Sequence, residues 1–139
     1  MNTPRRLLFL YTGGTLSMVQ ADDPGHLVPN DHVPDLSKLV PTLDQVAQID
    51  GSVITNVDSS DLVPTDWASL ATAIADANDD YDGFVVLHGT DTMTFTACAL
   101  SFMLGGDHKP VVLTGSQRPL AEPRTDARVN LVHSAICAT

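Results

Sequence analysis

The sequence has 139 residues, of which 43% are hydrophobic and 17% are charged, and its formal net charge is -10. A chain of this length forms one domain whose core needs no disulfide framework or structural metal, and its apolar content excludes extensive disorder. The acidic balance repels phosphate backbones and anionic lipid, so we expect no nucleic-acid partner and no membrane partner.

Short apolar runs rich in β-branched and aromatic residues predict four strands. These runs span residues 7–11, 53–57, 84–88 and 111–114. The first is too short for a signal peptide and stops at a glycine pair without a small-residue cleavage site. No run of about 18 apolar residues, as a membrane span would need, occurs anywhere in the sequence.

Three longer patterns between and after these runs predict helices. The first follows Thr65, a candidate N-cap, and repeats apolar residues from Trp67 to Ile74 at helical spacing. The second, Thr92–Leu104, is apolar nearly all round, so we expect a buried helix that a glycine pair ends. The third, Thr125–Ala138, places three apolar residues on one side: Val129, Val132 and Ile136.

Alternating strands and helices predict an α/β fold, with a mainly parallel sheet, helices on both faces and right-handed crossovers, of the flavodoxin or Rossmann-like kind. In such folds ligands bind at the carboxyl ends of the strands. The longest polar connection, Val19–Pro34, predicts a surface lid or a disordered loop. Cys98 and Cys137 have no metal-ligand spacing, and a mid-helix thiol at Cys98 is expected to be inert, which together favour a reducing, cytoplasmic location.

Polar segments rich in hydroxyl groups follow all four predicted strands. They are Thr12–Thr15, Asp58–Asp61, His88–Thr92 and Thr114–Pro119. Each has a structural interpretation of its own: a glycine turn, a serine turn, or a helix cap supplied by Thr90 or Asp91. Together they predict a crevice lined by hydroxyls, amides and one or two carboxylates, suited to a small polar ligand that resembles an amino acid.

Other chemistries have weaker support in the sequence. The glycines after the first strand lack the spacing of a dinucleotide-binding or phosphate-binding loop. The five histidines lack metal-ligand spacing, and His88, inside a buried strand, is expected to be a hydrogen-bonded core histidine. We therefore expect no metal site.

In this order, the four segments resemble the bacterial-type L-asparaginase family. Y-T-G-G-T (residues 11–15) and H-G-T-D-T-M (88–93) are similar to its two signature motifs. D-S-S-D (58–61) and T-G-S-Q-R-P-L-A-E (114–122) are similar to its type I, cytoplasmic branch. The resemblance covers the whole chain, which makes it specific.

The resemblance implies an amidohydrolase that cleaves the side-chain amide of asparagine, and less well that of glutamine, without a cofactor. Thr15 would be the nucleophile and form an acyl-enzyme that water hydrolyses. Thr90 and Asp91 match the family's second catalytic threonine and its aspartate, and Asp91 also binds the ammonium group of the substrate. Ser59 matches the residue that binds the α-carboxylate, and Ser60 takes the next binding position.

The sequence departs from the family in three ways. The lysine that activates the second threonine lies beyond residue 139, and neither Lys38 nor Lys109 matches it. His26 stands near the place of a lid tyrosine. Family members are homo-oligomers about twice this length, so residues 1–139 correspond to most of the N-terminal catalytic domain, with the C-terminal domain absent. We therefore expect the 139-residue chain alone to release little ammonia.

Three alternatives remain open. A non-catalytic lobe would keep Ser59 and Asp91 for binding an amino acid but would lack the lysine. The related amidotransferase subunit, which supplies ammonia for transfer-RNA-linked glutamate, is disfavoured because it carries an extra N-terminal domain. A flavodoxin-like nucleotide binder is disfavoured by the acidic charge and by the absence of a phosphate-binding loop.

Overall fold

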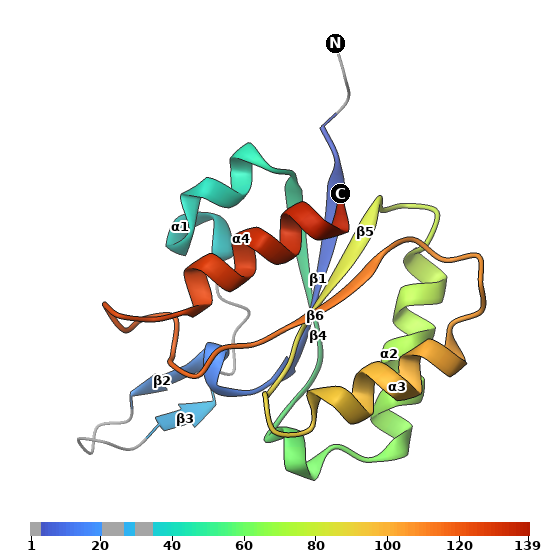
Figure 1. Ribbon diagram of the computed structural model, residues 1–139, viewed down its shortest axis with the longest axis horizontal. Coiled ribbons are helices and arrows are strands. Elements are labelled where there is room, and N and C mark those ends of the chain that lie inside the picture. Colours follow the sequence, from blue (N-terminus) through green and yellow to red (C-terminus); the bar gives the residue numbers. More distant parts are fainter. Residues whose placement is uncertain (1–3, 21–26, 30–34) are drawn as a thin grey trace.

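A parallel sheet of four strands forms the centre of the fold (Figure 1). A computed structural model describes residues 4–20, 27–29 and 35–139. The strands of the sheet are β1 (Arg6–Gly13), β4 (Gln48–Val57), β5 (Gly83–Leu87) and β6 (Val111–Thr114). Their order is β4-β1-β5-β6 and every neighbouring pair is parallel, which confirms the predicted α/β fold.

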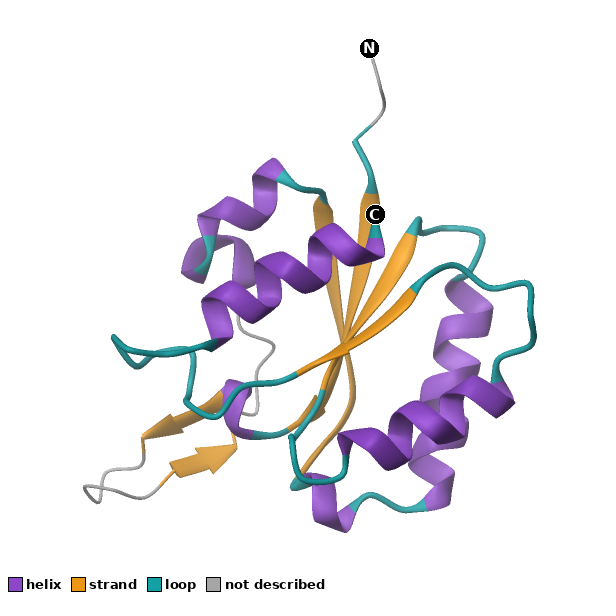
Figure 2. Ribbon diagram, viewed as in Figure 1, coloured by secondary structure: helices purple, strands orange, loops and turns teal. Residues whose placement is uncertain are grey.

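Helices cover both faces of the sheet (Figure 2). One face carries α2 (Pro64–Ala77) and α3 (Met93–Met103). The other face carries α4 (Ala127–Ala138), the short helix α1 (Leu36–Leu39) and the 3-10 turn η2 (Pro41–Gln45). A small antiparallel pair, β2 (Met18–Gln20) and β3 (Leu27–Pro29), lies beside the sheet. No helix in the described ranges has the length and apolarity that crossing a bilayer requires.

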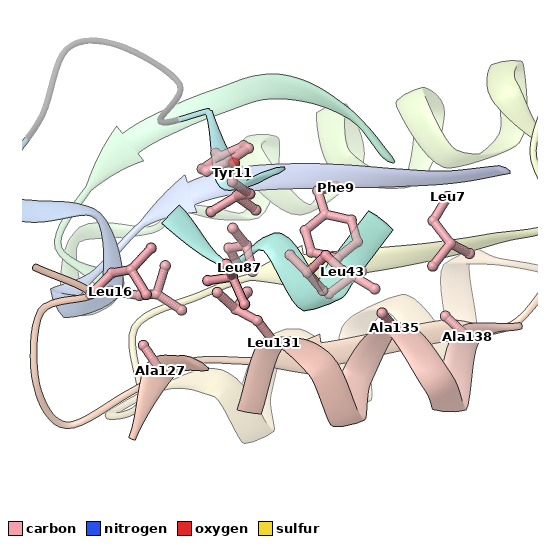
Figure 3. Packing of buried hydrophobic residues seen from close by; sticks show 14 of the residues in the cluster. Leu7, Phe9, Tyr11, Leu16, Leu43, Leu87, Ala127, Leu131, Ala135 and Ala138 are labelled. Atoms are coloured by element: carbon pink, nitrogen blue, oxygen red, sulfur yellow. The ribbon is translucent and has the colours of Figure 1, made fainter. Parts of the chain in front are cut away.

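The core has two layers because successive side chains of a strand point to opposite faces. Leu7 and Phe9 of β1 pack toward α4, whereas Leu8 and Leu10 pack toward α2 and α3. Figure 3 shows the first layer, in which Leu43 of η2 also lies against β1. Helix α4 contributes Ala127, Leu131, Ala135 and Ala138.

The predicted strands are confirmed, with one large difference in length. The run 111–114 coincides with β6, and β1 and β5 lie within two residues of their predicted bounds. β4 begins at Gln48, five residues before the predicted start. The apolar pattern did not predict these residues because β4 is an edge strand whose first half is polar and partly exposed. Its pairing with β1 starts at Gln48 and Arg6.

The predicted N-cap of α2 is wrong. Val63 occupies that position, and its N–H donates to the Asp66 carboxylate at 2.9 Å. The Asp66 carboxylate, in the first turn, thus accepts from the free backbone N–H at the helix start. Thr65 lies inside the helix, where its carbonyl accepts from the Ser69 hydroxyl.

The burial predicted for α3 and α4 is also wrong in part. α3 buries only a narrow face, and Phe95 and Phe102 are exposed. It ends at Met103, and the next residue is extended, so no left-handed glycine closes it; Gly13 and Gly14 alone have positive φ among the described residues. α4 buries its alanine-rich row, while Val129 and Ile136, two members of the predicted apolar side, are exposed.

Two further expectations concern the cysteines and the predicted lid segment. Cys98 and Cys137 are free thiols and both are exposed, and the expectation that the Cys98 thiol is inert stays a prediction. Most of the segment 19–34, including His26, lies outside the described residues.

Candidate active site

The turns that follow β1 and β5 touch at the point where the strand order reverses. The Thr12 hydroxyl donates to the Leu87 carbonyl at 2.9 Å. Gly14 has a φ of 88°, and a Cβ built on it would stand 2.6 Å from the Gly89 nitrogen. Only glycine combines this backbone conformation with so close an approach. The contact lies where open α/β sheets bind their ligands.

The turn after β4 joins this contact through Ser59. It is a 3-10 turn, η3 (Ser59–Asp61), in which the Asp58 carboxylate accepts from the Ser60 N–H at 2.8 Å. That bond is the main reason why the pKa of Asp58 lies below its ordinary value. Ser59 is buried against Gly89, whereas Ser60 is exposed. The turn interpretation of this segment is therefore confirmed, and the same turn directs Ser59 toward the β5 segment.

The segment after β5 does not cap its helix with Thr90 or Asp91. Thr92 is the N-cap residue of α3, but its hydroxyl accepts from no backbone N–H of the helix and instead donates to the Ser59 carbonyl at 2.7 Å. Thr90 and Asp91 are exposed beside the helix start. The helix-cap interpretation of these two residues is wrong, which leaves the Asp91 carboxylate at the positive end of an 11-residue helix.

The segment after β6 reaches the same place through Gln117. Its side-chain amide donates to the Thr90 hydroxyl oxygen at 3.1 Å. The Asp126 carboxylate holds the backbone of this segment, because it accepts from the N–H groups of Gln117 at 3.0 Å and Arg118 at 3.1 Å. The Gln117 bond is the first cause of the lowered pKa of Asp126. Asn130 adds bonds to the Gly115 carbonyl and to Asp126.

Sequence reasoning missed the roles of Gln117 and Asp126. Gln117 lies within the T-G-S-Q motif, and this motif was the one feature of the sequence that could have indicated its role. Asp126 falls inside the helix predicted from residue 125, where a surface carboxylate carries no signal. Its function depends on a turn that only the folded chain reveals.

Thr15 begins a 3-10 turn, η1 (Thr15–Ser17), directly after the Gly14 contact, and is half-buried. Its carbonyl accepts from the Met18 N–H. The four strand-end segments thus gather at one edge of the sheet, as predicted. Hydroxyls, an exposed carboxylate and the start of α3 meet there, which suits recognition of a zwitterionic ligand and stabilisation of developing negative charge.

His88 lies just beneath this edge and is only 1% exposed. Its Nδ1 lies 2.6 Å from the Gly89 carbonyl oxygen and its Nε2 lies 2.7 Å from the Thr96 hydroxyl oxygen. Burial lowers the pKa of the imidazole, and the Gly89 carbonyl opposes that effect. The prediction of a hydrogen-bonded core histidine is confirmed. Across the part of the chain that the structure describes, no group of three or more His, Cys, Asp or Glu side chains is placed to hold a metal ion.

Comparison with known proteins identifies the kind of domain. A family model described as "Asparaginase, N-terminal" matches residues 6–139. The chain is 45% identical over 131 residues to L-asparaginase 1 of Escherichia coli K12, a match that covers 92% of this chain and 38% of the relative. It is 42% identical over 129 residues to a subunit of the glutamyl-tRNA(Gln) amidotransferase of Pyrococcus abyssi, covering 92% of this chain and 30% of that protein.

A solved structure supports the same grouping. The crystal structure of L-asparaginase I from Vibrio cholerae matches with a TM-score of 0.78 and 37% identity, covering 99% of this chain and 42% of that chain. The chain thus spans less than half the length of the relatives and the structure that it matches.

Proposed function

The chain belongs to the asparaginase family as an N-terminal domain, and from that premise we propose that it carries the nucleophile and the substrate-binding residues of an L-asparagine amidohydrolase. The observation that carries the proposal is the contact of Gly89 with both Gly14 and Ser59. Through it, the turns that bear Thr15, Ser59 and Thr90 lie against one another. In the proposed site one molecule of asparagine contacts all three.

In the proposed reaction the Thr15 hydroxyl attacks the side-chain amide carbon of asparagine. The hydroxyl proton passes to the leaving nitrogen, the carbon–nitrogen bond breaks, and ammonia leaves an aspartyl ester on Thr15. Water then cleaves the ester to give aspartate and the free hydroxyl. Thr90 assists the proton transfers, and Asp91, exposed at the edge, pairs with the substrate ammonium.

The α-carboxylate of the substrate is assigned to the turn after β4. Ser59 is buried beside Gly89, and Ser60 is exposed next to it, so the two hydroxyls offer donors at different depths. Because Asp58 is engaged by the Ser60 N–H, its charge is partly offset within the turn. This arrangement favours binding of the substrate α-carboxylate, because the nearby Asp58 carboxylate repels it less.

The base for the threonines is not one of the two lysines of this sequence. Lys38 is exposed and pairs with Asp35 at 2.8 Å at the start of α1. Lys109 precedes β6, so it lies at the opposite end of that strand from Gln117. In the described ranges, neither lysine is therefore assigned as the activating group.

The test is ammonia release from L-asparagine by the complete gene product and its Thr15→Ala and Thr15→Ser variants. We expect Thr15→Ala to lower kcat by about a thousandfold or more, because a nucleophile of a cooperating set is lost, and Thr15→Ser to retain measurable turnover. Thr65→Ala, at an exposed position of α2, is the matched control and should match the wild type. Turnover by Thr15→Ala near the wild-type rate would refute the assignment.

The similarity to an amidotransferase subunit supports a second candidate. In that case the same site would release ammonia for transfer to a glutamyl-tRNA(Gln) held by another protein chain. The two candidates differ in what the purified protein does alone. Asparagine turnover without any partner supports the first; glutamine or asparagine turnover that appears only with a second protein and tRNA supports the other.

We also propose a cytoplasmic location, since Cys98 and Cys137 are exposed free thiols that suit a reducing compartment. A small amino acid remains the expected partner, and homo-oligomer formation stays a prediction of the family resemblance.

A further inference from the structure

A continuous chain of hydrogen bonds leads from α2 through α3 to the candidate active site. The Trp67 indole N–H donates to the Thr96 hydroxyl oxygen at 2.9 Å. That oxygen lies 2.7 Å from His88 Nε2, and His88 Nδ1 lies 2.6 Å from the Gly89 carbonyl oxygen. Thr96 and His88 are each 1% exposed. Water therefore has little access to the middle of the chain.

The donors and acceptors assign every proton in this chain. The Gly89 carbonyl can only accept, so Nδ1 of His88 carries the proton. A neutral imidazole then has an acceptor at Nε2, which the Thr96 hydroxyl must serve as donor. The Thr96 oxygen in turn accepts from Trp67, whose indole can only donate. All the bonds thus run in one direction, from Trp67 to Gly89, with His88 neutral, and burial favours the same state of the imidazole.

Gly89, where the chain of hydrogen bonds ends, is the residue on which the site converges. Gly14 approaches it from β1 and Ser59 approaches it from the turn after β4. Its carbonyl belongs to the peptide that leads into Thr90. Because that peptide is trans, a carbonyl held by His88 directs the Thr90 N–H away from the ring. The orientation of one peptide thus sets the starting geometry of Thr90 and Asp91.

We propose that Trp67, Thr96 and His88 are positioning residues that fix the Gly89–Thr90 peptide and thereby orient Thr90 and Asp91 for the reaction. This inference rests on the proposed function for its effect on rate, but the geometry it describes is independent of that function. Trp67 and Thr96 lie on the two helices that cover one face of the sheet. The packing of that layer is thereby coupled to the orientation of the site.

The matched test uses Thr96, which is outside the proposed catalytic and binding set. Thr96→Ser keeps the hydroxyl, whereas Thr96→Val keeps the shape and removes the bond to His88. In the complete gene product we expect kcat for L-asparagine to be about tenfold lower for Thr96→Val than for Thr96→Ser, the effect of one lost hydrogen bond. KM should differ by less than about threefold, because Thr92 holds the Ser59 carbonyl separately.

A control separates positioning from lost stability. Ile74→Val removes one methyl group from the same buried layer and leaves the hydrogen bonds intact. We expect its kcat to equal that of the wild type even where its thermal midpoint falls as far as that of Thr96→Val. A kcat for Thr96→Val within twofold of that for Thr96→Ser, or an equal loss in Ile74→Val, would overturn the inference.

A readout without substrate keeps the inference distinct from the proposed function. The backbone amide resonance of Thr90 should shift in Thr96→Val and remain near its wild-type position in Thr96→Ser. If the wild type releases no ammonia, the proposed function fails, and the Thr90 resonance alone decides the inference. An unchanged resonance in Thr96→Val contradicts it.

Discussion

The Cα of Gly89 lies so close to Ser59 that a Cβ added there would stand 2.7 Å from the Ser59 hydroxyl oxygen. A separation under about 3 Å is closer than any relaxed carbon–oxygen contact, so the approach of these two turns requires glycine at position 89. Gly14 approaches Gly89 from β1 in the same way. Three strand-end turns therefore meet at Gly89, whose side chain is a single hydrogen atom.

Replacement of this hydrogen by a methyl group should affect stability and binding together. We expect Gly89→Ala to lower the free energy of unfolding by about 1–3 kcal/mol, the range for overpacking, and to raise KM for asparagine because Ser59 must move. Gly106→Ala is the control, since a Cβ there meets nothing within 4 Å. Urea unfolding and steady-state kinetics measure both effects. Equal values for the two variants would contradict the contact.

The bond from Gln117 to Thr90 predicts an effect on rate. Gln117→Leu removes the donor to the Thr90 hydroxyl oxygen while keeping a side chain of similar size. We expect kcat to fall about two- to tenfold, which corresponds to one neutral hydrogen bond at an exposed site. Gln45→Leu, at an exposed glutamine on η2, should leave kcat unchanged. A Gln117→Leu enzyme as active as this control would exclude a role for the bond.

Asp126 gives a dependence of stability on pH. Its pKa lies below the ordinary value of 3.8, chiefly because the Gln117 N–H binds the charged form. A group whose pKa is lower in the folded state stabilises the fold above its unfolded pKa and loses that effect as the pH falls through the folded value. We therefore expect the stability difference between wild type and Asp126→Asn to be constant from about pH 5 to 8 and to shrink below about pH 4.

The measurement is urea unfolding of both proteins across this pH range. Asp44→Asn provides the control, because Asp44 lies on the exposed surface of η2. A difference between wild type and Asp126→Asn that grows as the pH falls would reverse the sign and refute the assignment.

The meeting of the strand-end segments at one edge of the sheet was predictable because its signal is local. Apolar runs such as 84–88 end abruptly in polar residues, and parallel strands bring such ends to one edge of a sheet. The position of Ser59 against Gly89 was not predictable, since it depends on the spacing of β4 and β5, which are not neighbours in the sheet because β1 lies between them. The first half of β4 could not be predicted either. An edge strand mixes polar and apolar residues, so Gln48–Ser52 contains no distinct apolar run.

The faces of α3 and α4 could not be predicted from apolar spacing. In α4, the row of Val129, Val132 and Ile136 is as apolar as the alanine-rich row that is buried. Small side chains on the buried row allow the helix to lie close to the sheet, which a count of apolar residues does not capture. In α3 nearly every position is apolar, so the sequence contains no contrast from which to derive an orientation.

The orientation of α3 can be measured directly with two residues of that helix. Leu100 is 2% exposed and packs with Leu70 and Ile74 of α2, whereas Phe102 is 91% exposed. We expect Leu100→Ala to cost about 2–5 kcal/mol of unfolding free energy, because it leaves a cavity between the helices and the sheet. Phe102→Ala removes more carbon atoms but should change stability by no more than about 0.5 kcal/mol, because its ring packs against little of the fold.

Urea denaturation of both variants decides between the orientations. Equal costs would mean that α3 is buried on all sides, as its composition suggests, and would contradict the observed packing of this face of the sheet.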